Sequence, residues 1–474
     1  VRLWDGTEAV PPFLQHSLNW IRTLLHGSVA QLVEQRPFKA LVPGSSPGRP
    51  TFSMKLSVTA AAIAACATTV SLRAADFDLA ATATNQFGID LHRQLATGDE
   101  NLCVSPYSIQ NALAMTFGGA DGDTRTEMAR VLHFPNDGDA IHASFSSLQR
   151  SLEEMAKKTA TLVEQSKQTG GPSEPITLSI ANRLFAQTGY DFRESFRAFV
   201  QKYYGAPFEL LDFRKDAPGA TQHINKWVAD QTRDRIRDLI PPGALNEMTR
   251  LVLANAIYLK APWAHEFNDG ATKPEQFHVR GGAAVGVPTM NRQDRQFGYA
   301  KRDNFIAVSL PYIGNELQFL VLVPDEVNGL RALESKLNAE TLAECAKLEP
   351  HDVDLSLPKF KFEPPTIQLG EKLQALGIKS AFDQPRGSAN FERIAPRKPD
   401  DYLYVSQVFH KTFIAVDEKG TEAAAATAVA MMATSAMVKK APPIEVKVDR
   451  PFVYAVQHVP SGACLFLGRV TDPR

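Results

Sequence analysis

The segment from Glu418 to Ala428 consists largely of small side chains, and this feature restricts the fold of the chain more than any other. Read with the period of a β-strand, Thr421 and the residues at every second position after it share one face, and Glu422 lies on the other. Such a strand needs no large pocket, so it can enter between existing strands. The charge of Glu422 lies on the face that can stay in water.

The flanking sequences indicate a strand on each side of this small-residue segment. Val405–Val416 precedes it and Ile444–Val456 follows it, and both are rich in β-branched and aromatic residues. Alanine is also the best helix former, so a helix over Ala423–Met437 is the alternative interpretation. The position between two strands favours the extended interpretation.

Coarse patterning predicts further elements elsewhere in the chain. Helical patterns dominate Leu79–Arg150, and strands are predicted over Leu317–Val323, Val353–Phe362 and Cys464–Val470. Thr124 to Glu127 has the spacing of a capping box, which predicts a helix start there. Helices and strands do not alternate regularly, so an α+β architecture is favoured over a doubly wound fold.

The small-residue segment resembles the reactive-loop hinge of the serpins, a family of protease inhibitors. The matching hinge positions are Glu418, Gly420, Thr421, Glu422, Ala423, Ala424, Ala425, Ala426 and Thr427. Arg450-Pro451-Phe452 matches the C-terminal signature of the family. Further serpin-like blocks follow in family order from about Asp76 onwards, and they include Asn101–Ile109, Ala181–Phe185, Leu253–Trp263, Val308–Tyr312 and Leu357–Phe360. The number and order of these blocks make the resemblance specific.

The resemblance implies a fold and two structural regions. The serpin fold is α+β, with three β-sheets, about eight to nine helices and an exposed reactive loop. Trp263 is expected at the breach, where the central sheet begins to open. The shutter, a polar cluster beneath that sheet, is expected to consist of Ser105, Ser108, Asn182, Asn255 and His410.

The resemblance also implies inhibition by trapping a serine protease, or a cysteine protease, as an acyl-enzyme. The cleaved hinge would insert as a new strand before water completes hydrolysis. Counting from Glu418 places the reactive bond between Thr434 and Ser435, where small and methionine neighbours suit elastase-like, subtilisin-like or chymotrypsin-like proteases. Counting back from Pro451 favours a later bond and a trypsin-like protease. The alternative bonds lie at Met432, Ala433, Lys439 and Lys440.

Before cleavage, Thr421 is expected to be exposed, so Thr421→Arg would leave the uncleaved fold intact but would impair insertion. Glu422 lies on the opposite face, so Glu422→Arg would impair insertion far less than Thr421→Arg.

Two other functions remain open. One is a non-inhibitory serpin that acts as a carrier or chaperone, although the small hinge residues favour an inhibitor. The other, more remote, is a secreted hydrolase, for which Ser105, Ser108 and His410 supply triad residue types without a Gly-x-Ser-x-Gly elbow.

The composition restricts the partners. The formal net charge of -1 disfavours nucleic acid. The basic pairs Lys157-Lys158 and Lys439-Lys440 fit solvated surfaces better than a heparin site. No phosphate loop, His-Glu-x-x-His or Cys-x-x-Cys motif occurs, so neither a cofactor nor a metal is predicted. A disulfide framework is not expected from the odd number of scattered cysteines after Cys66, and we expect a monomer whose partner is its target protease.

The N-terminal region divides into an extension and an export signal. Residues 1–53 lack sustained periodicity, partly resemble a translated transfer-RNA gene and are expected to be spurious or non-structural. Residues 54–74 resemble a secretory signal peptide with a short apolar run, which leaves a serpin-like domain at 75–474. We therefore expect a secreted or periplasmic protein of bacterial type. A lipid anchor on Cys66 is the alternative, because Ile63–Cys66 resembles a bacterial lipobox.

Overall fold

The structure is a computed structural model that describes residues 78–135, 138–166, 174–205, 208–280, 284–422 and 442–474, all within one compact unit. Nine α-helices occur in these residues, in agreement with the expected eight to nine. They are α3 (Asp78–Leu95), α4 (Pro106–Gly119), α5 (Gly122–Val131), α6 (Gly138–Ser166), α7 (Glu194–Tyr204), α8 (Phe213–Gln231), α9 (Leu330–Lys336), α10 (Ala339–Cys345) and α11 (Gly370–Leu376). Two 3-10 helices are η1 (Asp269–Ala271) and η2 (Ser380–Phe382).

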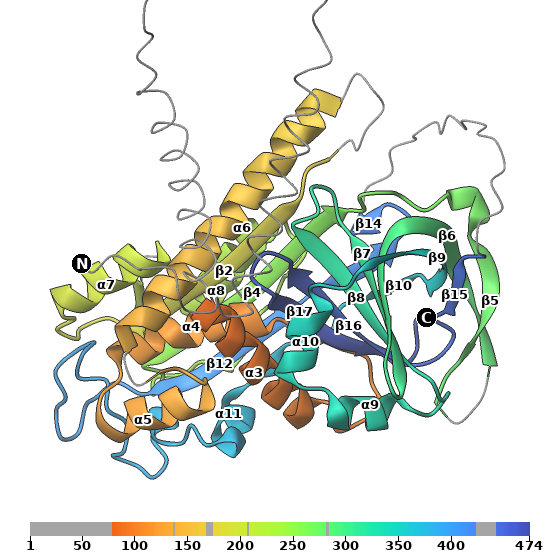
Figure 1. Ribbon diagram of the computed structural model, residues 1–474. Helices are drawn as coiled ribbons and strands as arrows, with labels where there is room; N and C mark the ends of the chain where they lie inside the picture. The colour runs from red at the N-terminus through yellow and green to blue at the C-terminus, as the bar shows by residue number, and fades with distance from the viewer. Residues whose placement is uncertain (1–77, 136–137, 167–173, 206–207, 281–283, 423–441) are drawn as a thin grey trace, which may run out of the picture. The chain divides into compact units, whose positions relative to one another are not determined.

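The strands of the described residues form two hydrogen-bonded networks (Figure 1). The first contains β1 (Leu102–Val104), β5 (Lys273–His278), β6 (Ala284–Lys301), β7 (Phe305–Pro311), β8 (Leu317–Pro324), β9 (Pro350–Pro358), β15 (Ile444–Lys447), β16 (Phe452–His458) and β17 (Ala463–Val470). The second contains β2 (Thr177–Gln187), β3 (Glu209–Leu211), β4 (Leu251–Pro262), β10 (Phe360–Phe362), β11 (Ile367–Gln368), β12 (Val405–Thr412), β13 (Ile414–Asp417) and β14 (Gly420–Thr421).

The long strand β6 explains why the expected three sheets are joined into two networks. Residues 284–298 of β6 pair with β5 and β9, whereas residues 298–301 pair with β7. The pairing with β9 shifts register between Asp294 and Phe297. One strand thus serves two sheets, which run on through β9 and β15 on one side and through β7, β8, β16, β17 and β1 on the other.

Strand β4 is the centre of the eight-stranded network. It runs parallel to β12 and antiparallel to β2. Leu251, Leu253 and Leu259 point into the main core, whereas Val252 and Ala254 belong to a second core that includes residues of α8. Burial on both faces explains why the sequence of β4 is an almost continuous apolar run.

Helix α4 lies between the two networks and α8 covers the other face of β2 and β4 (Figure 1). α4 contacts β17 on one side and β2 and β4 on the other, and every residue in it except Gly118 is buried. Ser105 is its N-cap, and the side chain accepts a hydrogen bond from the Ser108 amide. Pro106 fits the first turn because that turn needs no intrahelical N–H donor. The buried start of α4 therefore lies directly beneath β4.

Two details of the predicted elements are corrected. The predicted strand over Val353–Phe362 divides into β9 and β10 beside Pro358, and Ile444–Val456 divides into β15 and β16 beside Pro451. Proline cannot donate a ladder hydrogen bond, which accounts for both interruptions.

The capping-box prediction is wrong. Helix α5 begins at Gly122 with Asp121 as its N-cap, so Thr124 lies inside the helix. The carboxylate of Glu127 accepts hydrogen bonds from the backbone amides of Lys379 and Ser380 instead, both at 2.7 Å. The Glu127 carboxylate therefore accepts hydrogen bonds from a segment distant in the sequence, whereas the local pattern predicts that it caps the helix start.

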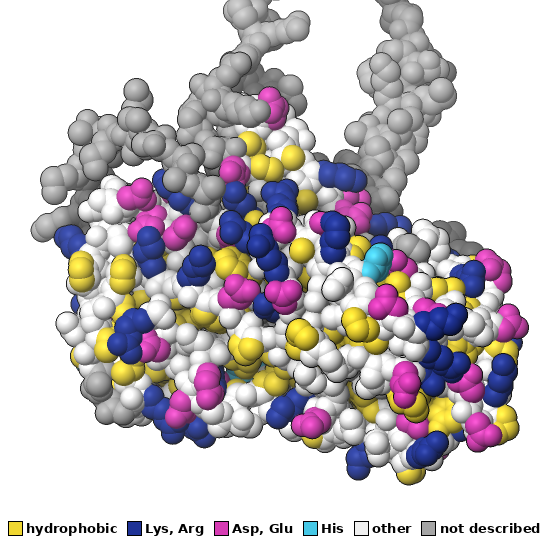
Figure 2. Space-filling view, turned by 180° about the vertical axis from the view of Figure 1, so that it is seen from behind, with side chains coloured by type: hydrophobic (Ala, Val, Ile, Leu, Met, Phe, Trp, Pro, Cys, Tyr) yellow, Lys and Arg dark blue, Asp and Glu magenta, His cyan; other side chains and the backbone are white. Residues whose placement is uncertain are grey.

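The surface seen in Figure 2 carries Lys and Arg side chains intermingled with Asp and Glu side chains, in keeping with the small net charge. Within the described residues, no helix combines the length and apolarity needed to cross a bilayer. Cys103, Cys345 and Cys464 are buried and carry free thiols.

Candidate functional site

Five polar residues from three strands and one helix meet on the inner face of the β4 sheet. Asn255 of β4 is directly opposite His410 of β12 on one side and Asn182 of β2 on the other. Ser105 and Ser108 contribute from the start of α4. The structure thus brings together all five residues predicted for the shutter, and we call them the shutter cluster.

A continuous chain of hydrogen bonds runs through the shutter cluster. The Ser105 amide donates to Nε2 of His410 at 3.1 Å, so the ring proton resides on Nδ1, which donates to Oδ1 of Asn255. The Asn255 amide donates to Oγ of Ser108 at 2.7 Å and to Oδ1 of Asn182. Nδ2 of Asn182 donates to the Ser108 carbonyl oxygen at 3.0 Å. The cluster therefore links β12, β4 and β2 to the helix beneath them.

The electrostatics of the cluster favour a neutral histidine. Burial lowers the pKa of His410 to about 3, although the hydrogen bond with Asn255 opposes the shift. The ring is therefore uncharged near neutral pH, and it can exchange hydrogen bonds without a buried charge being created.

The same geometry does not support a serine hydrolase. Nε2 of His410 accepts from the backbone of Ser105, and the Ser105 hydroxyl donates to the carbonyl oxygen of Leu465 at 2.6 Å. His410, Ser105 and Ser108 are all inaccessible to solvent. Neither serine hydroxyl is thus paired with the histidine as an activated nucleophile would be. Among the described residues, no group of three or more His, Cys, Asp or Glu side chains could hold a metal ion.

The start of the hinge forms a tight turn into the short strand β14. The carboxylate of Asp417 accepts hydrogen bonds from the amides of Lys419 at 2.9 Å and Gly420 at 3.3 Å. A Cβ atom at position 420 would lie 2.2 Å from the carbonyl oxygen of Ala261, so only glycine allows this approach.

Trp263 closes the end of β4 against this turn. Its ring stacks on Tyr312 with centroids 4.7 Å apart and planes 6° apart. The indole Nε1 donates to the Asp417 carbonyl oxygen at 2.9 Å, and the backbone amide of Trp263 donates to the Lys419 carbonyl oxygen at 3.0 Å. The residue predicted for the breach therefore contacts the first residues of the hinge directly.

Glu418 is held by an ion pair and a hydroxyl group. Lys359 donates to one carboxylate oxygen and Thr272 to the other, each at 2.7 Å. Burial by itself would raise the pKa of Glu418, but the hydrogen bonds from Lys359 and Thr272 outweigh it and hold that pKa below its usual value. The hinge is thus anchored at its first residue by a charged carboxylate.

The expectation that Thr421 is exposed before cleavage is wrong. Only 2% of Thr421 is accessible to solvent, and its hydroxyl forms a hydrogen bond with the hydroxyl of Tyr312. Thr421 pairs with Ala261 of β4 and with Val416 of β13. The beginning of the hinge therefore already lies between two strands.

Glu422, expected on the water-facing side, is buried as well, with 7% of its surface accessible. Its amide donates to the Ala415 carbonyl oxygen at 2.7 Å, and its carboxylate forms an ion pair with Arg235 in the segment after α8. Burial raises the pKa of Glu422, while Arg235 and Tyr258 oppose the shift. The outer face of the hinge is buried at Glu422 because the segment after α8 covers it.

These contacts define a fork in the sheet. β4 pairs directly with β12 as far as the Ile257–Thr412 pair, and Ala261 and Pro262 at the end of β4 pair with β14 instead. β14 runs antiparallel to β4 and to β13. The shutter cluster lies just below the fork, on the line between β4 and β12.

The remaining predicted positions lie outside the described residues. These are the hinge residues Ala423, Ala424, Ala425, Ala426 and Thr427, and the candidate reactive-bond residues Met432, Ala433, Thr434, Ser435, Lys439 and Lys440.

Three residues of this region were not anticipated as partners of the hinge. Tyr312 and Lys359 belong to sequence blocks that match the family, but nothing in those blocks indicates that they meet Thr421 and Glu418. Arg235 belongs to no recognised block, and no sequence signal could have found it.

Comparisons with known proteins agree with this architecture. A family model described as Serpin (serine protease inhibitor) matches residues 82–473. An uncharacterized serpin-like protein of Thermococcus kodakarensis is 36% identical over 395 residues, covering 83% of this chain and 85% of that protein. The leukocyte elastase inhibitor of Bos taurus is 35% identical over 401 residues, covering 82% of this chain and 98% of the inhibitor. The structure of uncleaved ovalbumin is similar with a TM-score of 0.68 and 28% identity, covering 83% of this chain and 100% of that chain.

The chain belongs to the serpin family of serine protease inhibitors. The predicted α+β serpin fold is thereby confirmed.

Proposed function

We propose that this protein is a suicide-substrate inhibitor of serine proteases, in which the cleaved loop inserts between β4 and β12. The observation that supports the proposal most strongly is the fork, where β14 already separates the end of β4 from β13. Its inhibitory relative, the leukocyte elastase inhibitor, supports the same class of target.

The register of β14 supports a specific path for the proposed insertion. If the Thr421–Ala261 pairing continues residue by residue, Thr427 comes opposite Asn255. If the Thr421–Val416 pairing continues in the same way, Thr427 also comes opposite His410. The incoming threonine would thus arrive where Asn255 and His410 now bind each other, and its hydroxyl can replace the hydrogen bond that opening breaks.

The first part of the inserting face consists of small residues, so this part of the path needs no cavity. On the face of Thr421, the next residues are Ala423, Ala425 and Thr427, and each inserted residue would add backbone hydrogen bonds to two neighbouring strands. Before cleavage, the loop is tied at both ends, at β14 and β15, and further insertion is restrained. The uncleaved fold is therefore metastable, and cleavage releases a strand that traps the acyl-enzyme faster than water attacks it.

Thr434–Ser435 is the proposed reactive bond, because insertion is measured from the hinge. The neighbouring methionine and alanine residues suit a protease with an elastase-like, subtilisin-like or chymotrypsin-like pocket. We also propose, from the signal-like sequence of residues 54–74, that this segment directs export to the periplasm or the medium, and that the inhibitor acts as a monomer.

Incubation with elastase, subtilisin, chymotrypsin and trypsin tests the proposal. At least one protease should form a complex with the inhibitor that survives boiling in detergent, and the same protease with its active-site serine blocked should form none. The Thr434→Arg variant should shift the preference towards trypsin, which would locate the reactive bond. Clean loop cleavage with undiminished protease activity for all four enzymes would contradict the proposal and favour a carrier or chaperone.

A further inference from the structure

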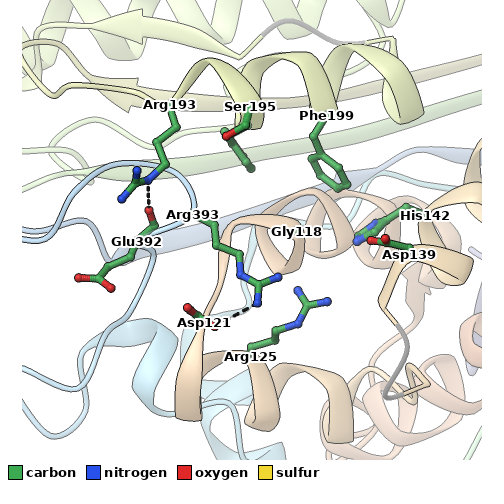
Figure 3. A pocket seen from close by; sticks show the side chains of 11 residues that line it. Gly118, Asp121, Arg125, Asp139, His142, Arg193, Ser195, Phe199, Glu392 and Arg393 are labelled. Atoms are coloured by element: carbon green, nitrogen blue, oxygen red, sulfur yellow. Dashed lines mark hydrogen bonds and ion pairs between the residues drawn. The ribbon is translucent and has the colours of Figure 1, made fainter.

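A cavity of about 420 Å3 lies away from the shutter cluster and the hinge, where four segments of the chain meet (Figure 3). The end of α4 and the start of α5 form one side, and the first turns of α6 and α7 form two others. The segment with Glu392 and Arg393 closes the fourth side. The serpin mechanism proposed above uses none of these residues.

Arg125 of α5 is half-buried, and the nearby carboxylates of Asp139 and Asp121 attract its charge. Its guanidinium donates to the carbonyl oxygen of Phe117 at 2.9 Å and lies 3.9 Å from the centre of the Phe117 ring. It also lies directly against the start of α6, because a Cβ atom at Gly138 would be 1.8 Å from Nη2. A carbonyl oxygen and a ring face leave most donors of a guanidinium unused.

A second guanidinium adds to the positive charge. Arg393 lies beside Arg125 in Figure 3 and pairs with Asp121 at 3.1 Å. Burial lowers the pKa of Arg125 and the charge of Arg393 lowers it further, while Asp139 and Asp121 oppose the shift. Asp139 also lines the cavity, whereas the carboxylate of Glu392 points away from Arg125. The Arg393–Asp121 pair is exposed and therefore weak enough for a ligand to compete with it.

The opposite wall is aromatic and includes the first turn of a helix. Phe196 and Phe199 of α7 line the cavity, and the buried ring of His142 meets Phe199 edge-on with centroids 4.6 Å apart. Ser195, in the first turn of α7, contributes a hydroxyl, and no side chain caps this helix start. Uncapped amides at a helix start favour anions.

We propose that this cavity binds a small organic anion that joins an oxyanion head to a flat apolar group. Arg125 and Arg393 would bind the head through charge-assisted hydrogen bonds, and Ser195 would donate its hydroxyl. The apolar group would pack against Phe196 and Phe199. A ring and a single head group fit a cavity of this size, which makes a phosphate monoester of an aromatic alcohol a suitable probe.

Titration calorimetry of the full-length protein with phenyl phosphate tests the proposal. One molecule should bind per chain, roughly tenfold or more tightly than inorganic phosphate, because the ring adds buried apolar surface. Arg125→Gln and Arg393→Gln should each weaken binding by roughly tenfold. Arg397→Gln removes a charge from the same segment outside the cavity and should leave the affinity unchanged.

Arg125→Gln also removes the contact with Phe117, so its thermal midpoint must be measured alongside. Arg393 is half-exposed, and its replacement keeps the proposal testable if Arg125→Gln does not fold. The proposal is overturned if phenyl phosphate gives no saturable binding, if Arg393→Gln binds it as the parent does, or if Arg397→Gln weakens binding equally.

Discussion

Asn255 and His410 are direct partners in the parallel pairing of β4 and β12, and a hydrogen bond joins their side chains. This bond crosses the line along which the proposed mechanism parts the sheet. The fork formed by β14 marks the upper end of the same line. Closure of the sheet and the route for insertion are therefore set by one pair of strands.

The burial of His410 predicts a defined pH dependence of stability. Its folded pKa of about 3 lies below the ordinary value of 6.5, so the unfolded state binds more protons between these values. The free energy of unfolding should therefore fall as the pH drops from about 6.5 towards 3, with a slope of up to ~1.4 kcal/mol per pH unit for this residue. The His410→Gln variant should show a smaller slope in urea unfolding.

Two other buried histidines contribute to the parent slope. Burial lowers the pKa of His142 to about 3 and that of His458 to about 4, so part of the dependence should persist in His410→Gln. Replacing the exposed His351 by Gln provides the matched control and should leave the slope as it is in the parent. Equal slopes for His410→Gln and the parent would refute the role given to burial.

Thr421→Arg should destabilise the uncleaved protein, because the structure buries Thr421 against Tyr312. Forcing a guanidinium into this position without a partner should cost about 3–5 kcal/mol, or detach β14. Thr421→Val, which removes only the hydroxyl, should cost about 1 kcal/mol. Thermal unfolding of the uncleaved variants measures both effects, and a midpoint of Thr421→Arg equal to that of the parent would contradict the observed burial.

Thr421→Arg and Glu422→Arg should differ in inhibition. Thr421→Arg should consume many more inhibitor molecules per protease inactivated, because slower insertion lets water complete hydrolysis. Glu422→Arg would place a second cation against Arg235, so it should destabilise the uncleaved protein too, instead of being nearly harmless. The stoichiometry of inhibition distinguishes Thr421→Arg from Glu422→Arg, because insertion requires a small side chain on the inner face, where Thr421 lies.

Gly420→Ala should release the start of the hinge from β4. The added methyl group would lie 2.2 Å from a backbone oxygen of Ala261, which cannot move away as a flexible side chain could. A loss of about 1–3 kcal/mol in the free energy of unfolding is expected. Gly286→Ala is the control, because a Cβ atom there meets no atom within 4 Å. Similar losses for both variants would show that close packing at position 420 is not the cause.

Much of the fold could be predicted because family motifs and strand patterns are local in sequence. The residues of the shutter cluster were predicted from such blocks, and the structure brings them together through the register of β2, β4 and β12. The capping box failed because Glu127 has distant partners, Lys379 and Ser380, which no local pattern can reveal.

The environment of the hinge could not be predicted for the same physical reason. Thr421 alternates correctly with the small residues after it, but its burial depends on Tyr312 and on the end of β4, both more than a hundred residues away. The sequence predicts that the charge of Glu422 faces solvent, whereas in the structure Glu422 pairs with Arg235 of the segment that covers it. Periodicity identifies the two faces of a strand, whereas tertiary packing determines which of them is buried.

The thermal midpoint before and after cleavage of the loop between β14 and β15 tests the central claim most directly. Calorimetry should show a large rise after cleavage, because the freed segment extends β14 and pairs with both β4 and β12. The Thr427→Arg variant, cleaved in the same way, should show a much smaller rise, because its arginine would meet the buried Asn255 and His410. An unchanged or lower midpoint of the cleaved parent would contradict strand insertion.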